Sequence, residues 1–403
     1  MCKHDKLRIL VLGITDSREP AFTPEVMAAI SGGHTFSGGK RHHEIVASLL
    51  PDDAVWIEIT ADLDSVFERY KAVEGDIIVF ASGDPLFFGF ANSIMKRMPE
   101  AEVKVIPTFN SLQMLAHRVP MRYDDMRIVS LTGRPWHEFD RALIERAPKI
   151  GVLTDRTHTP QAIALRMTDY GYIDYEMFVG ENLGNKERER VTHIRTLDKV
   201  GEFEHPNCII LVAHEGTVNV RRFGIPEGEF ELLDGRERMI TKMPIRLLTL
   251  QALELYSKTT FWDIGFCTGS VSIEAKLLFP HLHVRSFEIR QEGRSLMDIN
   301  SRRFGAPGIE VVIGDFLETD ISGMTAPDAV FIGGHNGQLE TIIRRLDEIM
   351  AAGGVIVMNS VTQDSHDTFI RVAEELGMPL VQDTRIAIDS HNPIHILKIR
   401  VKR

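Results

Sequence analysis

The sequence predicts an α/β protein built from more than one domain, and three observations support this prediction. A chain of 403 residues exceeds one ordinary hydrophobic core, so we expect two or three domains. Short apolar runs alternate with helical segments through both halves of the chain, which is typical of parallel sheets covered by helices. In the C-terminal half, residues 261–273 change from a buried strand through Gly265 and Gly269 into a helix. This order is typical of the ligand-binding end of a doubly wound sheet.

The N-terminal half begins with an apolar strand over residues 7–14, followed by a helix over residues 25–30. Thr23 is suited to cap this helix, and Pro24 is suited to its first turn. The β/α alternation then continues to residue 153, and the pattern changes from about residue 155. The further expected strands are 76–81, 103–106, 128–131, 150–153, 177–180, 191–195 and 208–213, and the further expected helices are 41–50, 86–98, 111–116 and 161–170.

A change of composition marks the expected domain boundary. Residues 215–235 are rich in glycine and charge and have no strong periodicity, which is typical of a linker. We therefore expect a first domain over residues 1–215, a linker over 216–235 and a second domain over 236–403. The second domain is predicted to open with an amphipathic helix that ends near Ser257.

The loop after the strand at residues 261–264 reads Asp263-Ile-Gly-Phe-Cys-Thr-Gly269, and its glycine spacing differs from that of the dinucleotide fingerprint. Asp-x-Gly-x-x-Thr-Gly is instead the loop of methyltransferases that hold S-adenosylmethionine. The next strand, 283–288, ends in Glu288, about where a carboxylate that binds ribose is expected. Strands 309–315 and 328–334 end in Gly314-Asp315 and in a glycine pair. Together these strand ends predict a Rossmann-like S-adenosylmethionine site, and the alternative is an ordinary α/β domain with glycine turns.

Longer motifs resemble two known families. The second half contains Thr241-Lys-x-x-Ile-Arg246, the loop from Asp263 to Glu274, and Phe331-Ile-Gly-Gly334, and it resembles the decarboxylating precorrin methyltransferases of cobalamin biosynthesis. The first half resembles the tetrapyrrole methylase family. The segments that carry this second resemblance are Gly83-Asp-Pro-Leu86, Pro107-x-x-x-Ser-Leu-Gln113, Val129-Ser-Leu-Thr-Gly-Arg134 and Glu181-Asn-Leu-Gly184.

The resemblance implies a two-part tetrapyrrole methylase domain followed by a Rossmann-like methyltransferase domain, each with one S-adenosylmethionine. It implies methylation of precorrin-6 or cobalt-precorrin-6 at carbon 5 by the first domain and at carbon 15 by the second. The second domain would also remove the ring C acetate carboxylate, which gives precorrin-8, and the protein would form a homo-oligomer. The family's first loop carries several glycines, whereas residues 12–16 here read Leu-Gly-Ile-Thr-Asp with one.

Site residues follow from these motifs. Around S-adenosylmethionine in the second domain we expect Thr241, Asp263, Gly265, Thr268, Gly269, Glu288, Gly314 and Asp315. For the first domain the resemblance implies Gly83, Asp84, Pro85, Leu86 and Ser111, although Asp84-Pro85 is equally consistent with a turn before a helix. His335 and Asn336 are the catalytic candidates for decarboxylation, with Arg246 as a planar donor to substrate carboxylates. The alternatives are a surface helix charge for Arg246 and a turn residue for His335.

Composition limits the other classes of function. The net charge of −11 argues against a nucleic-acid partner, and the absence of an apolar run of about 18 residues argues against a membrane span. Three cysteines without paired spacing predict neither a disulfide framework nor a metal site, and they suit the cytoplasm. Two other hypotheses stay open at this point. One is a methyltransferase with a single activity on RNA or another small molecule, and the other is a regulatory protein that binds S-adenosylmethionine.

Overall fold

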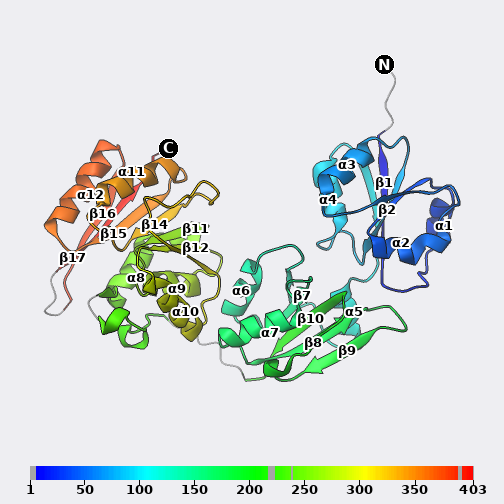
Figure 1. The fold of residues 1–403 in the computed structure, drawn as a ribbon, viewed down its shortest axis with the longest axis horizontal. Helices are drawn as coiled ribbons and strands as arrows, with labels where there is room; N and C mark the ends of the chain where they lie inside the picture. Colours follow the sequence, from blue (N-terminus) through cyan, green and yellow to red (C-terminus); the bar gives the residue numbers. More distant parts are fainter. Residues whose placement is uncertain (1–5, 217–222, 237–238, 389–392, 403) are drawn as a thin grey trace, which may run out of the picture. The chain divides into compact units, whose positions relative to one another are not determined.

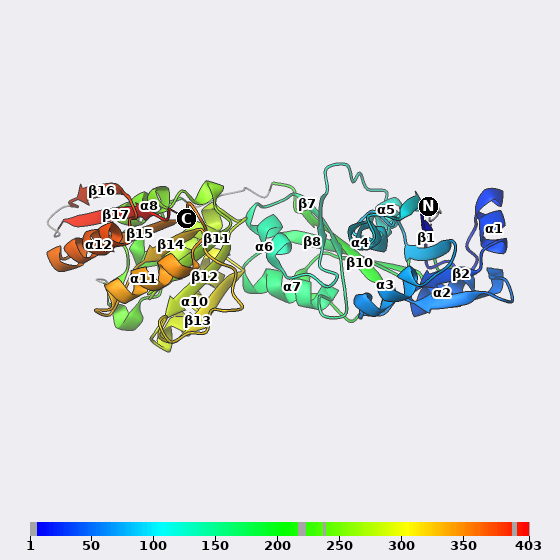
Figure 2. The same ribbon diagram turned by 90° about the horizontal axis from the view of Figure 1, so that it is seen from above.

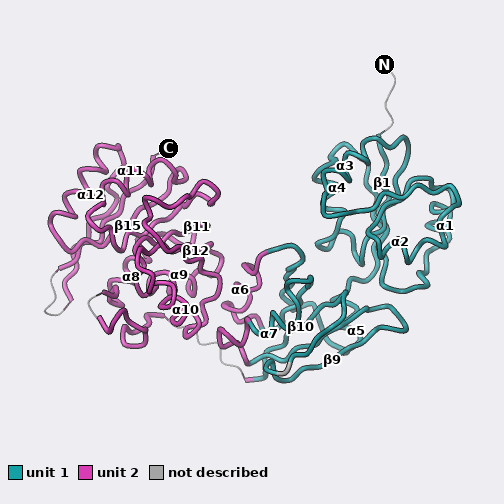
Figure 3. Tube along the Cα trace, viewed as in Figure 1, with its two compact units in different colours: residues 1–134, 148–165, 174–215 teal, residues 135–147, 166–173, 216–403 magenta. Residues whose placement is uncertain are grey.

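The computed structural model describes residues 6–216, 223–236, 239–388 and 393–402, and it confirms the predicted α/β fold. The chain divides into two compact units (Figure 3). Unit 1 comprises residues 1–134, 148–165 and 174–215, and unit 2 comprises residues 135–147, 166–173 and 216–403. Residues 217–222 of the expected linker lie outside the described residues. No helix in the described ranges is both long and apolar enough to cross a membrane.

The first sheet of unit 1 is entirely parallel, with strand order β3-β2-β4-β1-β5. Its strands are β1 (Arg8–Ile14), β2 (Thr35–Gly38), β3 (Val55–Glu58), β4 (Ile77–Ser82) and β5 (Glu102–Ile106). The helices between them are α1 (Pro24–Ser31), α2 (Lys40–Val46), α3 (Leu63–Lys71) and α4 (Phe90–Arg97). Val11 and Phe80 are fully or almost fully buried but lie in two different apolar clusters, so both faces of this sheet are covered.

The second sheet of unit 1 mixes parallel and antiparallel pairs in the order β6-β7-β10-β8-β9. Its strands are β6 (Arg127–Ser130), β7 (Lys149–Leu153), β8 (Tyr175–Glu181), β9 (Arg190–Ile194) and β10 (Asn207–Ala213). The helices of this part of the sequence are α5 (Ser111–Arg118), α6 (His137–Ile144) and α7 (Pro160–Asp169). Two successive five-stranded sheets are the two-part arrangement that the resemblance implied.

Unit 2 contains a seven-stranded sheet with the order β13-β12-β11-β14-β15-β17-β16. Its strands are β11 (Thr260–Ile264), β12 (His283–Glu288), β13 (Ile309–Ile313), β14 (Ala329–Ile332), β15 (Val355–Ser360), β16 (Leu380–Ile386) and β17 (Ile394–Arg400). Only β17 runs antiparallel to its neighbours, β15 and β16. The order of the strands reverses at β11, which pairs with both β12 and β14. In doubly wound sheets, ligands bind at the carboxyl ends of the strands beside such a reversal.

Helices cover both faces of this sheet (Figures 1 and 2). They are α8 (Met243–Ala252), α9 (Ser270–Leu278), α10 (Glu292–Phe304), α11 (Leu339–Ile349) and α12 (Gln363–Glu375). Alternate residues of β11 point to opposite faces, so Trp262 packs in the cluster with α11 and α12 while Phe261 packs in the cluster with α8 and α9. Asp263 shares the face of Phe261, which aims its carboxylate at α9.

Two expected helices have different limits. The helix expected over residues 86–98 begins only at Phe90, because the Asp84 side chain accepts a hydrogen bond from the Leu86 backbone and Phe88 has a positive φ of 54°. The helix expected to end near Ser257 ends at Ala252, because Glu254 adopts a left-handed conformation with φ 56°. The cap of α1 is confirmed, since Thr23 accepts from the backbone of Val26 and a proline occupies the first turn.

Candidate functional site

Two glycines shape the loop between β11 and α9. Gly265 has φ +77°, and a Cβ there would lie 2.6 Å from the Gly334 nitrogen, so only glycine lets the ends of β11 and β14 approach this closely. Gly269 is the left-handed N-cap of α9, with φ +78°, and a Cβ there would lie 2.6 Å from the sulfur of Met297. The sequence motif therefore reflects one loop that is folded tightly against its neighbours.

A cavity of about 900 Å³ opens at the carboxyl ends of β11, β12, β13 and β14. Most of the predicted site residues of the second domain line it. These are Thr241, Asp263, Gly265, Thr268, Glu288, Gly314, Asp315, His335 and Asn336. Gly269 and Arg246 do not line the cavity. The structure thus brings together residues that are up to 95 positions apart in the sequence, from Thr241 to Asn336 (336 − 241).

Asp263 is almost completely buried at the end of β11, and only one of its two oxygens has a partner within the described residues. Its Oδ2 accepts a hydrogen bond of 2.5 Å from the Ser272 hydroxyl on α9. Burial raises the pKa of Asp263 to about 7, the Ser272 hydrogen bond opposes this shift, and the charge of Glu288 adds to it. A cationic ligand beside the free oxygen would stabilise the ionised form.

Glu288, at the end of β12, fixes the shape of the loop. Its Oε2 accepts from the backbone nitrogen of Cys267 at 2.9 Å, and its Oε1 accepts from the backbone of Arg290 at 3.1 Å and from its guanidinium at 3.0 Å. A carboxylate oxygen has two lone pairs, so Oε2, which accepts one hydrogen bond, keeps the capacity to accept another from a ligand in the cavity.

Four buried polar atoms on the cavity wall have no partner among the described residues, namely Asp263 Oδ1, Thr268 Oγ1, His335 Nδ1 and Asn359 Nδ2. Leaving such atoms unpaired is costly, at roughly 1–3 kcal/mol each, so a polar ligand is the natural partner. Asp263 Oδ1 and Thr268 Oγ1, both at the glycine loop, fit the polar amino acid part of S-adenosylmethionine, and Glu288 can accept a hydrogen bond from its ribose. The residues present therefore fit this cofactor.

Asn359 was missed in the sequence. It lies near the end of β15 and lines the cavity, its Oδ1 accepts a 3.0 Å hydrogen bond from Thr249 on α8, and its Nδ2 is buried without a partner among the described residues. An apolar strand that ends in Asn-Ser could have signalled it, because parallel pairing of β15 with β14 brings these two strand ends together.

The structure gives Arg246 a different role from the predicted one. Arg246 and Glu274 are both fully buried, and they form an ion pair in which the two side chains lie 2.5 Å apart. The remaining guanidinium nitrogens donate to the backbone carbonyls of Thr241, at 2.8 Å, and Ile225. Arg246 therefore holds the segment that carries Thr241 in place, and its nitrogens do not face the cavity. The basic side chains that do line the cavity are Lys242 and Arg290.

Cys267 does not have the surroundings of a nucleophile. It is buried with φ 51°, and burial raises the pKa of its thiol, to which the charge of Glu288 adds. A thiol with a raised pKa stays protonated at neutral pH, whereas nucleophilic cysteines have lowered values.

The residues predicted for the first domain cluster where β4 ends. Gly83 has φ +60°, its nitrogen donates to the Ile14 carbonyl at 2.8 Å, and its carbonyl accepts from Thr108 at 3.2 Å. A Cβ on Gly13 would lie 2.0 Å from the Gly83 oxygen, which explains the single glycine that the loop at residues 12–16 retains. The remaining predicted residues surround this point: Pro85 is buried, Leu86 is exposed, Asp84 closes the turn, and Ser111 begins α5.

A polar cluster beside Gly83 was not predicted. Asp16 is buried, and its carboxylate accepts from Arg41 and Asn185 at 3.3 Å each. Arg41 and His42, both from α2, lie 2.9 Å from the Ser82 hydroxyl. Burial lowers the pKa of His42 to about 4, assisted by the charge of Arg41, so His42 is neutral at pH 7. The loop at residues 12–16, which has fewer glycines than the family's first loop, thus places the carboxylate of Asp16 in a hydrogen-bonded network.

Two family models match the chain. Residues 11–200 match the tetrapyrrole (corrin/porphyrin) methylases, and residues 233–398 match the precorrin methyltransferase domain. Both matches agree with the fold and the motifs described above.

Three relatives cover the chain or one of its halves. A precorrin-6Y C(5,15)-methyltransferase (decarboxylating) of Sinorhizobium is 29% identical over 96% of this chain and 92% of its own length. A cobalt-precorrin-6B C(15)-methyltransferase (decarboxylating) of Salmonella typhimurium is 33% identical over 40% of this chain and 83% of its own. The cobalt-precorrin-7 C(5)-methyltransferase of the same organism is 27% identical over 51% of this chain and 98% of its own. These names agree with the activity implied by the sequence motifs and not with an RNA methyltransferase or a regulatory protein.

Proposed function

Because the chain belongs to the decarboxylating precorrin methyltransferase family, with a tetrapyrrole methylase half preceding it, we propose that it methylates a precorrin-6 substrate at carbons 5 and 15 and removes its ring C acetate carboxylate. The observation that carries the proposal is the 900 Å³ cavity of unit 2, whose wall holds four unpartnered polar atoms beside the glycine loop. One molecule of S-adenosylmethionine per domain supplies the electrophilic methyl groups when bound.

In the C-terminal cavity, we assign the positively charged end of the cofactor to Asp263 and its ribose to Glu288. Asp263 Oδ1 is unpartnered and buried, so an ammonium group there gains a charge-assisted hydrogen bond and stabilises the ionised carboxylate. Gly314 and Asp315 lie beside Phe316 on the cavity wall, where an adenine ring would find both an apolar surface and a hydrogen-bond acceptor.

Methyl transfer to carbon depends on alignment more than on acid or base groups, and positioning contributes up to roughly 7–11 kcal/mol in good cases. The far wall of the cavity is apolar and includes Ile386, Ile388 and Ile394, next to the ends of β16 and β17. An apolar stretch of the cavity wall suits a flat macrocycle that must present one carbon to the methyl group.

Decarboxylation requires the leaving carboxylate to stay ionised while its carbon–carbon bond breaks and the electron pair enters the macrocycle. Burial lowers the pKa of His335, so its ring is neutral at pH 7 and offers one nitrogen donor without a counter-charge. We assign His335, Asn336 and Asn359 to positioning the acetate, and Lys242 and Arg290 to carboxylates of the macrocycle that stay in place.

For the first domain we propose that the residues around Gly83 bind the second cofactor molecule and that this domain methylates carbon 5. The domain limits of 1–215 and 236–403, the homo-oligomeric state and the cytoplasmic location are predictions on which the function does not depend.

The test measures S-adenosylhomocysteine release by purified protein with a precorrin-6 substrate and, separately, with RNA. We expect release with the tetrapyrrole alone, and a loss of at least tenfold in the decarboxylating methylation at carbon 15, measured as carbon dioxide release, in D263N, which removes the charge beside the C-terminal cofactor. Equal release with RNA, or an unchanged rate in D263N with the tetrapyrrole, would contradict the proposal. The matched control is D328N, because Asp328 bonds Thr259 and Thr260 at the opposite end of β11 and does not line the cavity.

A further inference from the structure

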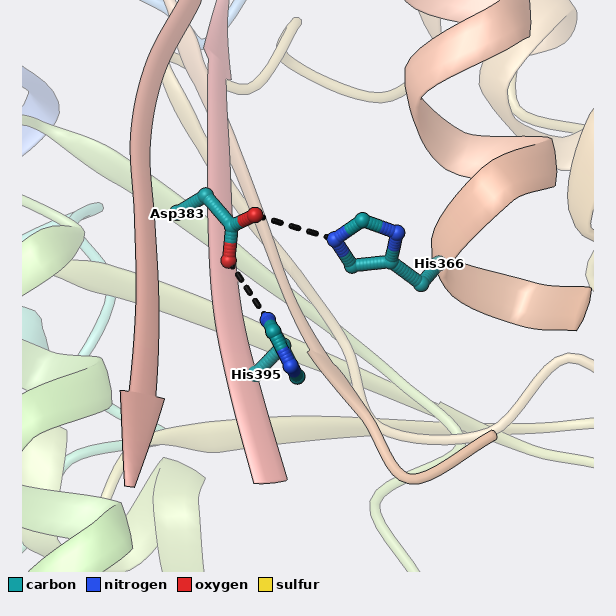
Figure 4. A group of neighbouring side chains, drawn as sticks. All are labelled: His366, Asp383 and His395. Atoms are coloured by element: carbon teal, nitrogen blue, oxygen red, sulfur yellow. Dashed lines mark hydrogen bonds and ion pairs between the residues drawn. The ribbon is translucent and has the colours of Figure 1, made fainter. Parts of the chain in front are cut away.

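Two histidines and one aspartate meet where α12 covers the edge of the seven-stranded sheet, and none of the three lines the cavity described above (Figure 4). His366 lies in the first turn of α12, Asp383 on β16 and His395 on β17. Within the described ranges they form the one group of three or more such side chains whose ligand atoms lie close enough for a metal ion.

Strand register brings two of the three together. In the antiparallel pair of β16 and β17, Asp383 lies opposite Leu397 and Arg385 lies opposite His395, so Asp383 and His395 are diagonal neighbours on one face. Leu397 on the same face packs with Phe369 of α12. The helix therefore covers this face, and its first turn presents His366 to the pair.

The spacing of the three ligand atoms is that of a metal site. His366 Nε2 lies 2.9 Å from Asp383 Oδ2, and His395 Nδ1 lies 2.7 Å from Asp383 Oδ1. All the ligand atoms lie within 4.8 Å of one another. Ligands about 2.0–2.1 Å from a tetrahedral zinc ion are separated by about 3.3 Å, so the short contacts must open by roughly half an ångström and the widest separation must close by up to about 1.5 Å to accommodate the ion. The side chains are 15–30% exposed, which leaves a fourth position open to water.

A second carboxylate fixes the state of His366. Its Nδ1 lies 3.1 Å from Asp367 Oδ1, and Gln363 donates to the same oxygen at 2.7 Å. Histidines that bind metals commonly donate their other ring nitrogen to a carboxylate in this way. The contact with Asp367 restricts rotation of the His366 ring and keeps its Nε2 directed at Asp383.

We propose that His366, Asp383 and His395 bind one divalent transition-metal ion, for which zinc is the probe, and that the bound ion joins the start of α12 to β16 and β17. Two imidazoles and one carboxylate are donors that zinc and its neighbours in the first transition row accept. Asp367 orients His366 as the outer partner. The proposal does not rest on the proposed methyltransferase function, and it revises the expectation of no metal site.

The experiment uses the full-length, untagged chain after treatment with EDTA, and it measures bound zinc by equilibrium dialysis and elemental analysis. We expect one zinc ion per chain, a loss of affinity of at least about tenfold in D383N and H395Q, and a loss of about 10–100-fold in D367N. The matched control is H193Q. His193 also pairs with a carboxylate, that of Glu176 at 2.6 Å, but belongs to no group of three among the described residues, so its loss should leave zinc binding unchanged.

Absence of bound zinc in the wild-type chain, or equal affinity in wild type, D383N and H395Q, would overturn the proposal. Circular dichroism shows whether the variants remain folded. If D383N and H395Q unfold, anomalous diffraction at the zinc edge from wild-type crystals locates the bound zinc ion instead. A peak between the three side chains supports the site, and a zinc peak elsewhere, or none, contradicts it.

Discussion

Replacing Gly265 with alanine tests the central structural feature of the cofactor loop. Gly265 has φ +77°, and its missing Cβ would lie 2.6 Å from the nitrogen and 2.8 Å from the Cα of Gly334. Those are backbone atoms of the loop after β14, so they cannot rotate away as the end of a flexible side chain would. The substitution must therefore push apart the two loops that form the centre of the cavity wall.

Two separate costs are expected in G265A, namely the left-handed conformation of an alanine and the steric contact of its Cβ with Gly334. The left-handed conformation costs an alanine about 1–2 kcal/mol, and this cost applies at any glycine with such a φ. Gly353 supplies a matched control, because it has φ +74° and no heavy atom within 4 Å of its missing Cβ. G353A should therefore lose about 1–2 kcal/mol of unfolding free energy and nothing else. G265A should lose more, and only G265A should lose affinity for S-adenosylmethionine.

The assay compares urea unfolding and calorimetric binding of S-adenosylmethionine in the wild type and both variants. We expect G265A to bind at least tenfold more weakly, which corresponds to about 1.4 kcal/mol, while G353A binds like the wild type. If G265A binds the cofactor with wild-type affinity at its C-terminal site, or if G353A loses as much affinity as G265A, the contact between the two loops does not shape the site.

Three further predictions follow from buried groups of unit 2. Affinity for S-adenosylmethionine should rise as the pH increases through about 7, because a cationic ligand favours the ionised form of Asp263, whose pKa in the free protein is about 7. Calorimetry from pH 5.5 to 8.5 should show this rise in the wild type and not in D263N. R246A should lose about 3–5 kcal/mol in urea unfolding, because it leaves Glu274 charged and unpaired in the interior; a loss below about 1 kcal/mol would contradict this. H335Q should slow carbon dioxide release at least tenfold with cofactor affinity unchanged, and an unchanged release rate would remove His335 from the site.

The fold and the cofactor loop could be predicted because their determinants lie close together in the sequence. The run from Asp263 to Gly269 contains the strand end, both left-handed glycines and the N-cap of α9 within seven positions (269 − 263 + 1). Glu288 and Asp315 could also be found, because Glu288 ends β12, Asp315 follows the end of β13 by two residues, and parallel strands align their carboxyl ends.

Residues whose role depends on distant partners could not be predicted. Arg246 resembles a surface charge until Glu274, 28 positions later, is seen to pair with it in the interior. Asn359 is a polar residue at the end of an apolar strand, but its contact with the cavity follows from the pairing of β15 with β14 and from its bond to Thr249 on α8. His366 and His395 are joined by Asp383 through the antiparallel register of β16 and β17 and the packing of α12, and no local spacing encodes this contact.

Mass spectrometry of the product tests the central claim most directly. Purified protein is incubated with S-adenosylmethionine and a precorrin-6 substrate, with and without cobalt, and the mass of the tetrapyrrole is compared before and after the reaction. The account predicts a gain of two methyl groups and the loss of one carbon dioxide. An unchanged mass with either substrate, in protein that binds S-adenosylmethionine tightly, would contradict it.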